Sequence, residues 1–420
     1  MSQIEERFRK LCVMGLGYIG LPTASLLASK GFDVHGVDVN AQVVDTINQG
    51  RIHIREPELD ILVKSAVQSG QLKAGTSPAA ADVFIIAVPT PFKDGYEPDL
   101  AYVESATRAI ASFLVSGNLV ILESTSPVGT TELIAQWLSE ERPDLSLKGT
   151  TSNGADTSVH IAHCPERVLP GQIIRELVDN DRIVGGIDEA STELAADFYR
   201  QFVAGQILTT NSRTAEMAKL TENTFRDVNI ALANELSLIC EQLSIDVWEL
   251  IKLANHHPRV NILNPGPGVG GHCIAVDPWF IVHTAPQQSK LIRTARQVNT
   301  DKPEYVIEKV RARAARIQNP TIACFGLAYK PDIDDLRESP ALHITQQLSE
   351  AGIGRILAVE PYIDTLPKVL ANTSVELCDQ ETALAQADII LGLVSHRQFR
   401  KLSPAMLQEK IVIDSCGVWR

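Results

Sequence analysis

Short runs of apolar residues recur along the first third of the chain, separated by polar loops and by stretches of helical periodicity. The clearest runs are residues 11–14, 34–37, 82–88 and 119–123. Continuous apolar runs of this length are typical of strands that are buried on both faces of a parallel sheet. Because they alternate with helices, they predict a doubly wound α/β domain.

A single long helix is predicted next. Apolar residues recur at helical spacing from about Asn211 to about Leu243, and Asn211, Ser212 and Thr214 can cap its start. At 1.5 Å per residue this helix is on the order of 45 Å long, which exceeds most helices of globular proteins. We expect it to bridge two domains.

The last quarter of the chain repeats the first pattern. Residues 387–394 resemble residues 81–88, and the apolar run 356–359 ends at Glu360, as the earlier run ends at Asp38. These similarities predict two Rossmann-like doubly wound domains joined by a long central helix and a helical middle domain. The expected domains are residues 1–208, 209–318 and 319–420.

Composition narrows the class of protein. No apolar run reaches the roughly 18 residues of a membrane span, and the first ten residues are charged, without the apolar core of a signal peptide. We therefore expect a cytoplasmic protein with no membrane association. The net charge of −13 argues against binding of nucleic acid. Seven cysteines without a CxxC motif or a Cys/His cluster argue against a disulfide framework and a metal site.

A glycine-rich turn follows the first predicted strand and opens a helix. Its glycines are Gly15, Gly17 and Gly20, with Leu16, Tyr18 and Ile19 between them. Alone, this motif could be a plain turn, but an acid, Asp38, lies eighteen positions downstream and ends the second strand. The turn amides would hold a pyrophosphate, and Asp38 would bind ribose hydroxyls and repel a 2′-phosphate. The motif therefore predicts NAD rather than NADP.

Two further loops follow strands on the same side of the predicted sheet. One contains Thr90, and the other contains Thr125 and Thr131. Each could simply be a turn with helix caps. In a dinucleotide-binding domain, Thr90 and Thr131 are candidate cofactor contacts, and Thr125 could order a catalytic water.

Three polar residues share one face of the long helix. Lys219, Asn223 and Arg226 lie at positions i, i+4 and i+7. They could form a solvated stripe, but apolar neighbours suggest partial burial. Loss of solvent around a lysine lowers the pKa of its ammonium group. Such a lysine can act as an acid or a base in catalysis.

Cys273 is the candidate nucleophile. It follows the glycine-rich residues 268–271, and Asp277-Pro278 just downstream predicts a helix that Asp277 caps, with its positive end nearby. Cys164, beyond another apolar run and beside Glu166, is a competitor, but packing at a strand end explains it better. A thiol near a dinucleotide suits oxidation of an alcohol past the aldehyde to an acid, because a hemithioacetal can lose a second hydride.

Two more features bear on ligands. Arg259 could anchor its own loop or clamp a ligand, and we favour it over the neighbouring histidines. The turn at residues 325–331 has one glycine where a dinucleotide loop has three. A uridine nucleotide suits this second half better than a second NAD.

Residues 212–238, 255–281 and 325–339 together resemble the UDP-sugar 6-dehydrogenases, the family that includes enzymes acting on UDP-glucose and UDP-N-acetylmannosamine. The resemblance covers nearly the whole chain. UDP-glucose dehydrogenases have a serine before the nucleophilic cysteine and a phenylalanine after the glutamate of the Pro-Glu motif. His272 and Arg167 stand at these positions here, which is similar to the branch that oxidises N-acetylated sugars. Residues 274–280 favour UDP-N-acetyl-D-mannosamine by resemblance.

The resemblance implies a four-electron oxidation of this sugar at C6 to the uronate, with two NAD per turnover. The product would serve a bacterial surface polysaccharide, such as enterobacterial common antigen or a capsule-like polymer. The first domain would bind NAD, the central domain would carry Lys219 and Cys273 and form a homodimer on the long helix, and the last domain would bind the UDP-sugar.

The resemblance also implies residue roles. Cys273 would attack the C6 aldehyde, Lys219 would be the acid/base supported by Asp277, and Glu166 would be the base for thioester hydrolysis. Arg337 would reach the NAD phosphates, and the loop around Arg259 would serve the neighbouring subunit's site. The implied contacts of the UDP-sugar are Arg167, Val168, Lys219, Asn223, Arg226, His257, Arg259, Gly270, Tyr329 and Lys330.

Two alternatives stay open. The substrate could be UDP-N-acetylglucosamine or UDP-glucose, because nothing in the sequence reads the configuration at C2. The protein could also be a non-catalytic NAD-binding regulator, although binding alone would not need Lys219, Asn223, Cys273 and Asp277 together.

Overall fold

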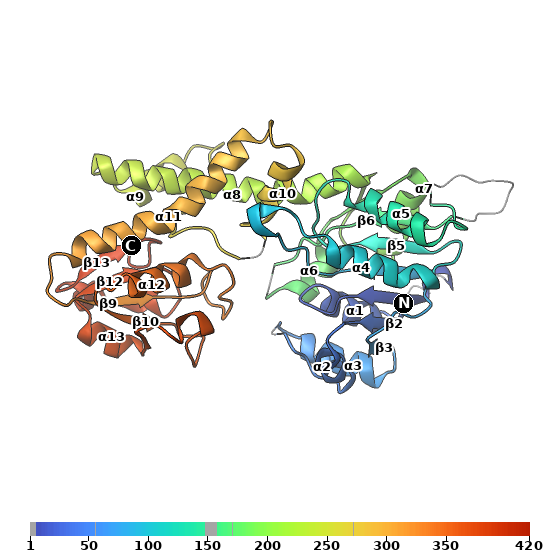
Figure 1. Cartoon of the computed structure of the whole chain (residues 1–420), viewed down its shortest axis with the longest axis horizontal. Coiled ribbons are helices and arrows are strands. Elements are labelled where there is room, and N and C mark those ends of the chain that lie inside the picture. The colour runs from blue at the N-terminus through green and yellow to red at the C-terminus, as the bar shows by residue number, and fades with distance from the viewer. Residues whose placement is uncertain (1–5, 55, 148–157, 170, 272) are drawn as a thin grey trace. The chain divides into compact units, whose positions relative to one another are not determined.

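The computed structural model describes residues 6–54, 56–147, 158–169, 171–271 and 273–420 (Figure 1). The chain divides into two compact units, Met1–Thr221 and Glu222–Arg420. Among the described residues, no helix is long and apolar enough to cross a membrane.

An eight-stranded sheet forms the centre of the first unit, in the order β3-β2-β1-β4-β5-β6-β7-β8. The strands are β1 (Lys10–Met14), β2 (Asp33–Val37), β3 (Leu72–Gly75), β4 (Val83–Ile86), β5 (Leu119–Leu122), β6 (His160–His163), β7 (Arg182–Gly186) and β8 (Ile207–Asn211). Strands β1 to β6 are parallel in the Rossmann order 3-2-1-4-5-6, as the apolar runs predict. The expectation of a parallel sheet fails at β7, which pairs with β6 in the antiparallel direction.

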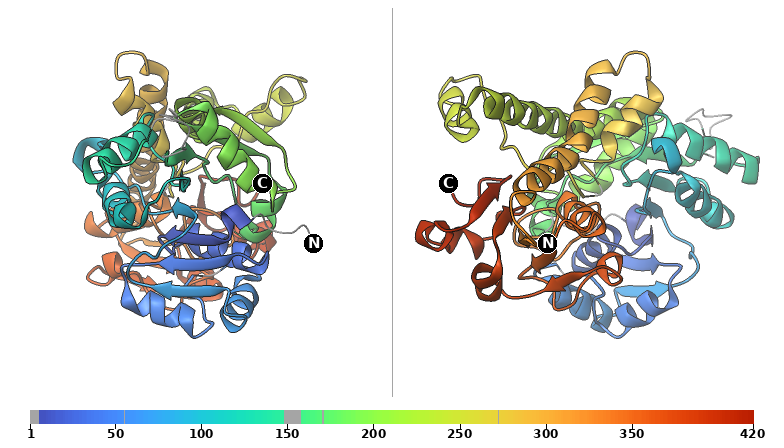
Figure 2. Two further views of the ribbon diagram at one scale, coloured as in Figure 1. Left: turned by 90° about the vertical axis from the view of Figure 1, so that its right-hand side faces the viewer. Right: turned by 60° about the vertical axis from the view of Figure 1, so that its left-hand side comes forward.

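Helices cover both faces of this sheet (Figure 2). Successive strand residues point to opposite faces, so each face buries its own apolar cluster. One cluster contains side chains of α1 (Gly20–Ser29), α3 (Leu59–Gln68), α6 (Ile173–Asp179) and α7 (Glu189–Arg200), and the other those of α4 (Ala101–Ile110) and α5 (Thr130–Glu141). The remaining elements are α2 (Ala41–Asn48), η1 (Glu6–Phe8), η2 (Asp94–Tyr96) and η3 (Ala111–Phe113).

The predicted long helix is α8 (Ser212–Leu243), which has 32 residues. At 1.5 Å per residue it is about 48 Å long. The Asn211 side chain caps it by accepting a hydrogen bond from the Thr214 amide at 2.9 Å, as the sequence predicts. Residues 212–221 of this helix belong to the first unit and the rest to the second.

Helices α9 (Val247–Ala254), α10 (Asp277–Thr284) and α11 (Lys290–Ala314) form the helical part of the second unit. Buried polar residues join α8 to α11. Arg296 donates to Asp227 at 2.5 Å, and Asn234 donates to Asn299 at 2.9 Å. The two helices therefore pack side by side through a polar seam.

A five-stranded parallel sheet completes the second unit, in the order β11-β10-β9-β12-β13. Its strands are β9 (Thr321–Phe325), β10 (Arg355–Val359), β11 (Val375–Leu377), β12 (Ile389–Gly392) and β13 (Ile411–Asp414); the other elements are α12 (Pro340–Glu350), α13 (Gln380–Gln386), η4 (Lys368–Leu370), η5 (Phe399–Lys401) and η6 (Pro404–Leu407). Helices α11 and α12 cover one face, and α13 and η5 cover the other. The order repeats that of β3-β2-β1-β4-β5, so the predicted fold class is confirmed.

Candidate active site

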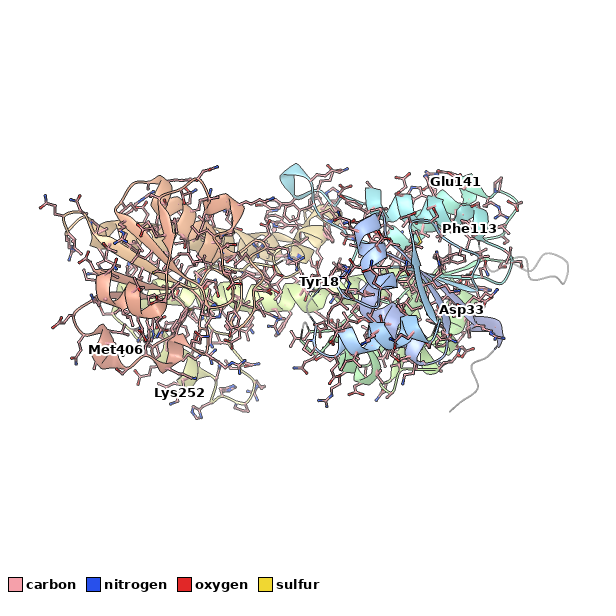
Figure 3. The ribbon with its side chains drawn as sticks, turned by 90° about the horizontal axis from the view of Figure 1, so that it is seen from below. Tyr18, Asp33, Phe113, Glu141, Lys252 and Met406 are labelled. Atoms are coloured by element: carbon pink, nitrogen blue, oxygen red, sulfur yellow. The ribbon has the colours of Figure 1, made fainter. Side chains whose placement is uncertain are left out.

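The glycine-rich turn joins β1 to α1, and Tyr18 lies in it (Figure 3). At Gly15 the backbone φ is 91°, and a Cβ there would lie 2.8 Å from the Ala87 carbonyl oxygen. A Cβ on Gly20 would lie 1.8 Å from the Gly15 carbonyl oxygen. Gly17, by contrast, has nothing within 4 Å of its Cβ position. The turn is tight at both ends and open in the middle, which fits close approach of a pyrophosphate.

Asp38 stands beside this turn at the end of β2. Its carboxylate accepts hydrogen bonds from the Leu16 amide at 3.1 Å and the Asn40 amide at 2.9 Å. It is half-buried, so lone pairs remain open to a ligand. The turn, the N-terminus of α1 with Ile19 as its N-cap and this carboxylate together fit an NAD site.

The loops after β4 and β5 lie together, as expected. The Thr90 hydroxyl donates to the Thr125 carbonyl at 2.5 Å. Thr131, however, already has a partner inside the protein, because its hydroxyl and amide both donate to the buried Glu216 carboxylate at 2.6 and 2.8 Å. Gly129 donates to the same carboxylate at 2.6 Å. Glu216 thus binds the N-terminus of α5, and contact of Thr131 with a cofactor stays a prediction.

The loop after β6 holds the competing cysteine and three candidate residues. Cys164 is fully buried, and burial raises the pKa of its thiol to about 11, so it packs at the strand end as predicted. Glu166 is also buried. Arg167 donates to the Asp181 carbonyl at 3.1 Å, and Val168 packs against the core of the first unit.

Cys273 lies in the second unit and is exposed. Its carbonyl accepts hydrogen bonds from the Val276 amide at 3.0 Å and the Asp277 amide at 2.9 Å, which form the turn into α10. The prediction that Asp277 is the N-cap is wrong. Val276 occupies that position, and the Asp277 carboxylate instead accepts a hydrogen bond from Asn223 on α8. His272 lies outside the described residues.

The glycines before Cys273 pack against the turn after β9. A Cβ on Gly270 would lie 2.4 Å from the Glu338 carbonyl oxygen and 2.9 Å from Cβ of Tyr329. The Gly271 amide donates to the Arg337 carbonyl at 3.3 Å. These glycines therefore permit contact between two loops, in addition to any approach of substrate. The structure brings the predicted nucleophile loop and the segment of Tyr329, Lys330 and Arg337 together.

The predicted polar face of α8 is only partly buried. Lys219 and Asn223 are half-buried, as expected, whereas Arg226 is exposed. The loop after α9 holds the two other basic candidates at the surface. Arg259 and His257 are both exposed, and the Arg259 amide donates to the His257 ring at 3.3 Å.

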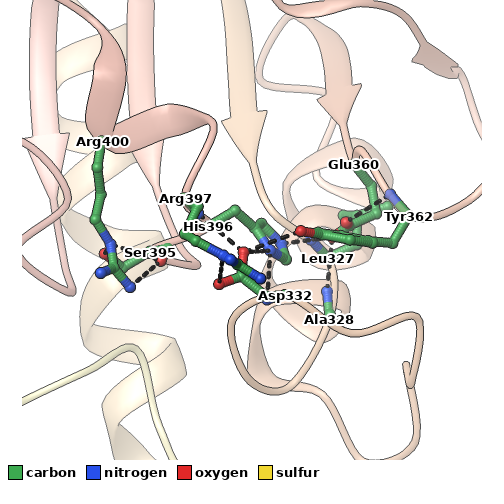
Figure 4. A network of polar contacts seen from close by, with 9 residues as sticks. All are labelled: Leu327, Ala328, Asp332, Glu360, Tyr362, Ser395, His396, Arg397 and Arg400. Atoms are coloured by element: carbon green, nitrogen blue, oxygen red, sulfur yellow. Dashed lines mark hydrogen bonds and ion pairs between the residues drawn. The ribbon is translucent and has the colours of Figure 1, made fainter. Parts of the chain in front are cut away.

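An acid also ends the second strand of the C-terminal half, but its surroundings differ (Figure 4). The buried Glu360 carboxylate accepts hydrogen bonds from the Leu327 and Ala328 amides at 2.7 and 3.0 Å, and from the His396 ring at 3.1 Å. The other His396 nitrogen accepts from the Asp332 amide at 2.9 Å. The protein's own carboxylate therefore occupies the turn amides that a dinucleotide would need.

Comparison with known proteins agrees with this geometry. The chain matches three domains described as the NAD binding, central and UDP binding domains of the UDP-glucose/GDP-mannose dehydrogenase family, over residues 9–203, 213–301 and 323–420. It is 58% identical to the NDP-N-acetyl-D-galactosaminuronic acid dehydrogenase of Ralstonia nicotianae, over 99% of this chain and 97% of the relative. It is 57% identical to the UDP-N-acetyl-D-mannosamine dehydrogenase of Yersinia pestis, over 98% of this chain and 100% of the relative. The solved UDP-D-ManNAc dehydrogenase of Pyrococcus horikoshii has a TM-score of 0.86 and 40% identity, over 98% of this chain and 96% of that one.

The chain belongs to the UDP-glucose/GDP-mannose dehydrogenase family. It is an NAD-dependent dehydrogenase, so the predicted family, enzyme class and cofactor are confirmed. The family's NAD binding domain matches the half that has the open glycine turn. Its UDP binding domain matches the half in which Glu360 binds the turn amides.

Sequence reasoning missed the buried charges that hold these loops. Glu216 and Glu360 bind loop amides, Arg182 pairs with Glu166, and Glu56 accepts hydrogen bonds from the Gly171 and Ile173 amides at 2.9 Å each. Glu56, Arg182 and Glu216 lie in polar or mixed stretches, so no local pattern marks them. Their partners lie far away in the sequence, so only the fold identifies them.

Proposed function

We propose that this protein oxidises UDP-N-acetyl-D-mannosamine at C6 to UDP-N-acetyl-D-mannosaminuronate, consuming two NAD per sugar. The observation that carries the proposal is similarity over 98% of this chain to a UDP-N-acetyl-D-mannosamine dehydrogenase. In this chain the exposed Cys273 follows Gly270 and Gly271, which pack against Tyr329. The uronate would supply a bacterial surface polysaccharide.

Cys273 carries the covalent part of the reaction. When bound, NAD accepts the hydride removed in each of the two oxidations. Between them, the Cys273 sulfur bonds to C6 of the aldehyde, and the thiol proton passes to the carbonyl oxygen. The second oxidation turns this hemithioacetal into a thioester. Water then attacks the thioester carbon, the C–S bond breaks, and the acid leaves while Cys273 regains its thiol.

Other residues move protons and orient groups in this scheme. Lys219 takes the proton of the C6 hydroxyl and stabilises negative charge on its oxygen, and the Asn223–Asp277 pair orients the region around it. Glu166 accepts a proton from the hydrolytic water, which Thr125 helps to place. The remaining predicted contacts keep their proposed roles: Arg167, Val168, Arg226, His257, Arg259, Gly270, Tyr329 and Lys330 toward the UDP-sugar, and Thr90, Thr131 and Arg337 toward NAD.

A homodimer is part of the proposal. Phe225, Leu232 and Ile239 lie seven residues apart on α8 and are 64%, 50% and 43% exposed. Apolar side chains at this spacing form one stripe along a helix, and large exposed apolar stripes mark interaction surfaces. A second copy of the chain would cover it. We place the enzyme in the cytoplasm, because a reducing compartment keeps the exposed thiol of Cys273 in its reduced state.

Sugar identity rests on the relatives, which carry two different sugar names at nearly equal identity. We therefore compare turnover of UDP-N-acetylmannosamine, UDP-N-acetylgalactosamine, UDP-N-acetylglucosamine and UDP-glucose by NADH absorbance. The first should give the highest kcat/KM, with two NADH formed per sugar. A large preference for another sugar would replace the proposed substrate.

A cysteine pair tests the chemistry. Cys273→Ser should lower acid formation by about 10³-fold or more, because the weaker nucleophile cannot turn over the covalent intermediate. Cys164→Ala is the control and should keep turnover, since that thiol is buried. Wild-type acid formation by Cys273→Ser, or loss only in Cys164→Ala, would refute the assignment.

A further inference from the structure

Among the described strands of the first sheet, β6 and β7 form the one antiparallel pair, and β8 runs parallel to β7. Glu166 and Arg182 lie next to this pair. In the β6–β7 pair, Ala162 lies opposite Gly186 and His163 opposite Gly185. Glu166 lies three residues beyond the end of β6, and Arg182 is the first residue of β7, which runs back past this loop. A parallel β7 would place a different residue there.

Arg182 is fixed on several sides. Its guanidinium donates to Oε1 of Glu166, and the two side chains are only 3% and 5% exposed. Its second arm donates to the Leu177 carbonyl at 3.1 Å. The guanidinium carbon lies 5.3 Å from the centre of the Tyr199 ring, in cation–π range. Such a buried arginine can move little, so it defines where the Glu166 carboxylate stands.

The second oxygen of Glu166 is different. Among the described residues, Oε2 is buried and has no hydrogen-bond partner. A buried carboxylate without a cation would take up a proton, because burial disfavours the charged form. Paired with Arg182 through one oxygen, Glu166 can stay ionised and keep the other oxygen for a ligand.

A second carboxylate shares the surroundings of Arg182. Glu123 is buried and accepts a hydrogen bond from the Tyr199 hydroxyl at 2.9 Å. Burial raises the pKa of Glu123, against the opposing charge of Arg182. The other titratable groups in this cluster, Cys164 and Tyr199, also have pKa values raised by burial. Among the described residues, Glu166 therefore has the direct ion pair with Arg182, whereas Glu123 is held by Tyr199.

We infer that Arg182 is a positioning residue for hydrolysis of the thioester: it holds Glu166 ionised, with Oε2 free to take the water's proton. The inference rests on the proposed role of Glu166. As the water oxygen bonds to the thioester carbon, its proton passes to Oε2, and the C–S bond to Cys273 then breaks. Arg182 itself touches neither substrate nor cofactor in this step.

The test separates the oxidations from hydrolysis. Three proteins are mixed with NAD and UDP-sugar: wild type, Arg182→Met and Glu166→Gln. Stopped flow follows the burst of NADH formation. After an acid quench, mass spectrometry measures how much protein carries the acyl group. Arg182→Met should keep the burst, accumulate the Cys273 thioester and hydrolyse it about 100-fold more slowly at pH 7. Because Arg182→Met removes the cation paired with Glu166, hydrolysis should recover as the pH rises, whereas wild type should not need the higher pH.

Glu123→Gln is the matched control, since it alters the other carboxylate beside Arg182 and should keep the wild-type hydrolysis rate and pH profile. Wild-type hydrolysis by Glu166→Gln would refute the base assignment in the proposed function. A different outcome is slow hydrolysis by Glu166→Gln together with a wild-type hydrolysis rate and pH profile in Arg182→Met. This outcome would refute the positioning role of Arg182 and leave the base assignment of Glu166 intact. If Arg182→Met does not fold, Arg182→Lys takes its place. A lysine cannot span both Glu166 and Leu177, so its hydrolysis should fall about tenfold with the burst intact, and an unchanged rate would overturn the inference.

Discussion

Replacing Glu360 by glutamine should loosen the turn that carries Tyr329 and Lys330 without disturbing the NAD half. Oε2 of Glu360 accepts hydrogen bonds from the Leu327 amide, the Ala328 amide and the His396 ring, and Oε1 accepts one from the Tyr362 amide at 3.2 Å. An amide side chain keeps the shape but removes the charge. An NH₂ group then replaces one of the two carboxylate oxygens and faces hydrogen-bond donors instead of accepting from them.

The size of the effect follows from these bonds. A hydrogen bond to a charged acceptor contributes about 1.5–3 kcal/mol net, and a neutral one about 0.5–1.5 kcal/mol. The difference is about 1 kcal/mol per bond, so the three bonds to Oε2 account for about 3 kcal/mol. The opening equilibrium of the turn should therefore increase by about 100-fold, at 1.4 kcal/mol for each factor of ten.

Hydrogen–deuterium exchange measures this opening locally, which matters because a chain of two units need not unfold in one transition. Peptides covering residues 326–331 should exchange about 100-fold faster in Glu360→Gln, and UDP should bind more weakly while NADH binding is unchanged. Glu350→Gln, on an exposed position of α12, is the matched control. Exchange within about twofold of wild type, with unchanged UDP affinity, would refute the view that this carboxylate stabilises the turn.

Two further predictions concern the second unit. Gly270→Ala should lower kcat/KM for the UDP-sugar by about tenfold or more with NADH binding intact, because its Cβ would collide with the Glu338 carbonyl. Gly266→Ala, whose Cβ would have no neighbour closer than 3.8 Å, should have little effect, and equal losses in both variants would contradict the packing argument. Burial lowers the pKa of Lys302 from 10.5 to about 8. The unfolded chain then binds this proton more tightly, so wild-type stability should rise by up to about 3 kcal/mol as the pH rises from 8 toward 10.5. Lys302→Met should flatten this part of the pH profile of urea unfolding, and identical slopes would refute the assignment.

The sequence predicts the buried centre of each sheet much better than its edges. Strands β1, β4 and β5 are continuous apolar runs because both of their faces are covered. The edge strands β3 and β8 bury few side chains, so no apolar run marks them. The direction of β7 could not be predicted either, since neither its arginine nor its two glycines carry information on pairing.

The candidate site divides in the same way. Residues that belong to a local motif, such as the glycine turn with Asp38, could be placed from spacing alone. Contacts between distant segments could not. Asp277 lies one position inside α10 and accepts a hydrogen bond from Asn223, and Thr131 donates to Glu216. Both contacts join segments that lie far apart in the sequence, so local spacing could not reveal them.

The two acids that end the second strand of each half show how one fold serves two nucleotides. Asp38 binds a single turn amide, that of Leu16, and stays half-buried, so its carboxylate can still accept from ribose hydroxyls. Glu360 is one methylene longer, reaches two turn amides and a histidine, and is buried. A second NAD would have to displace these bonds at a cost of several kcal/mol. The longer side chain thus closes the dinucleotide position of the second half and leaves the half-buried Tyr329 and Lys330 for another ligand.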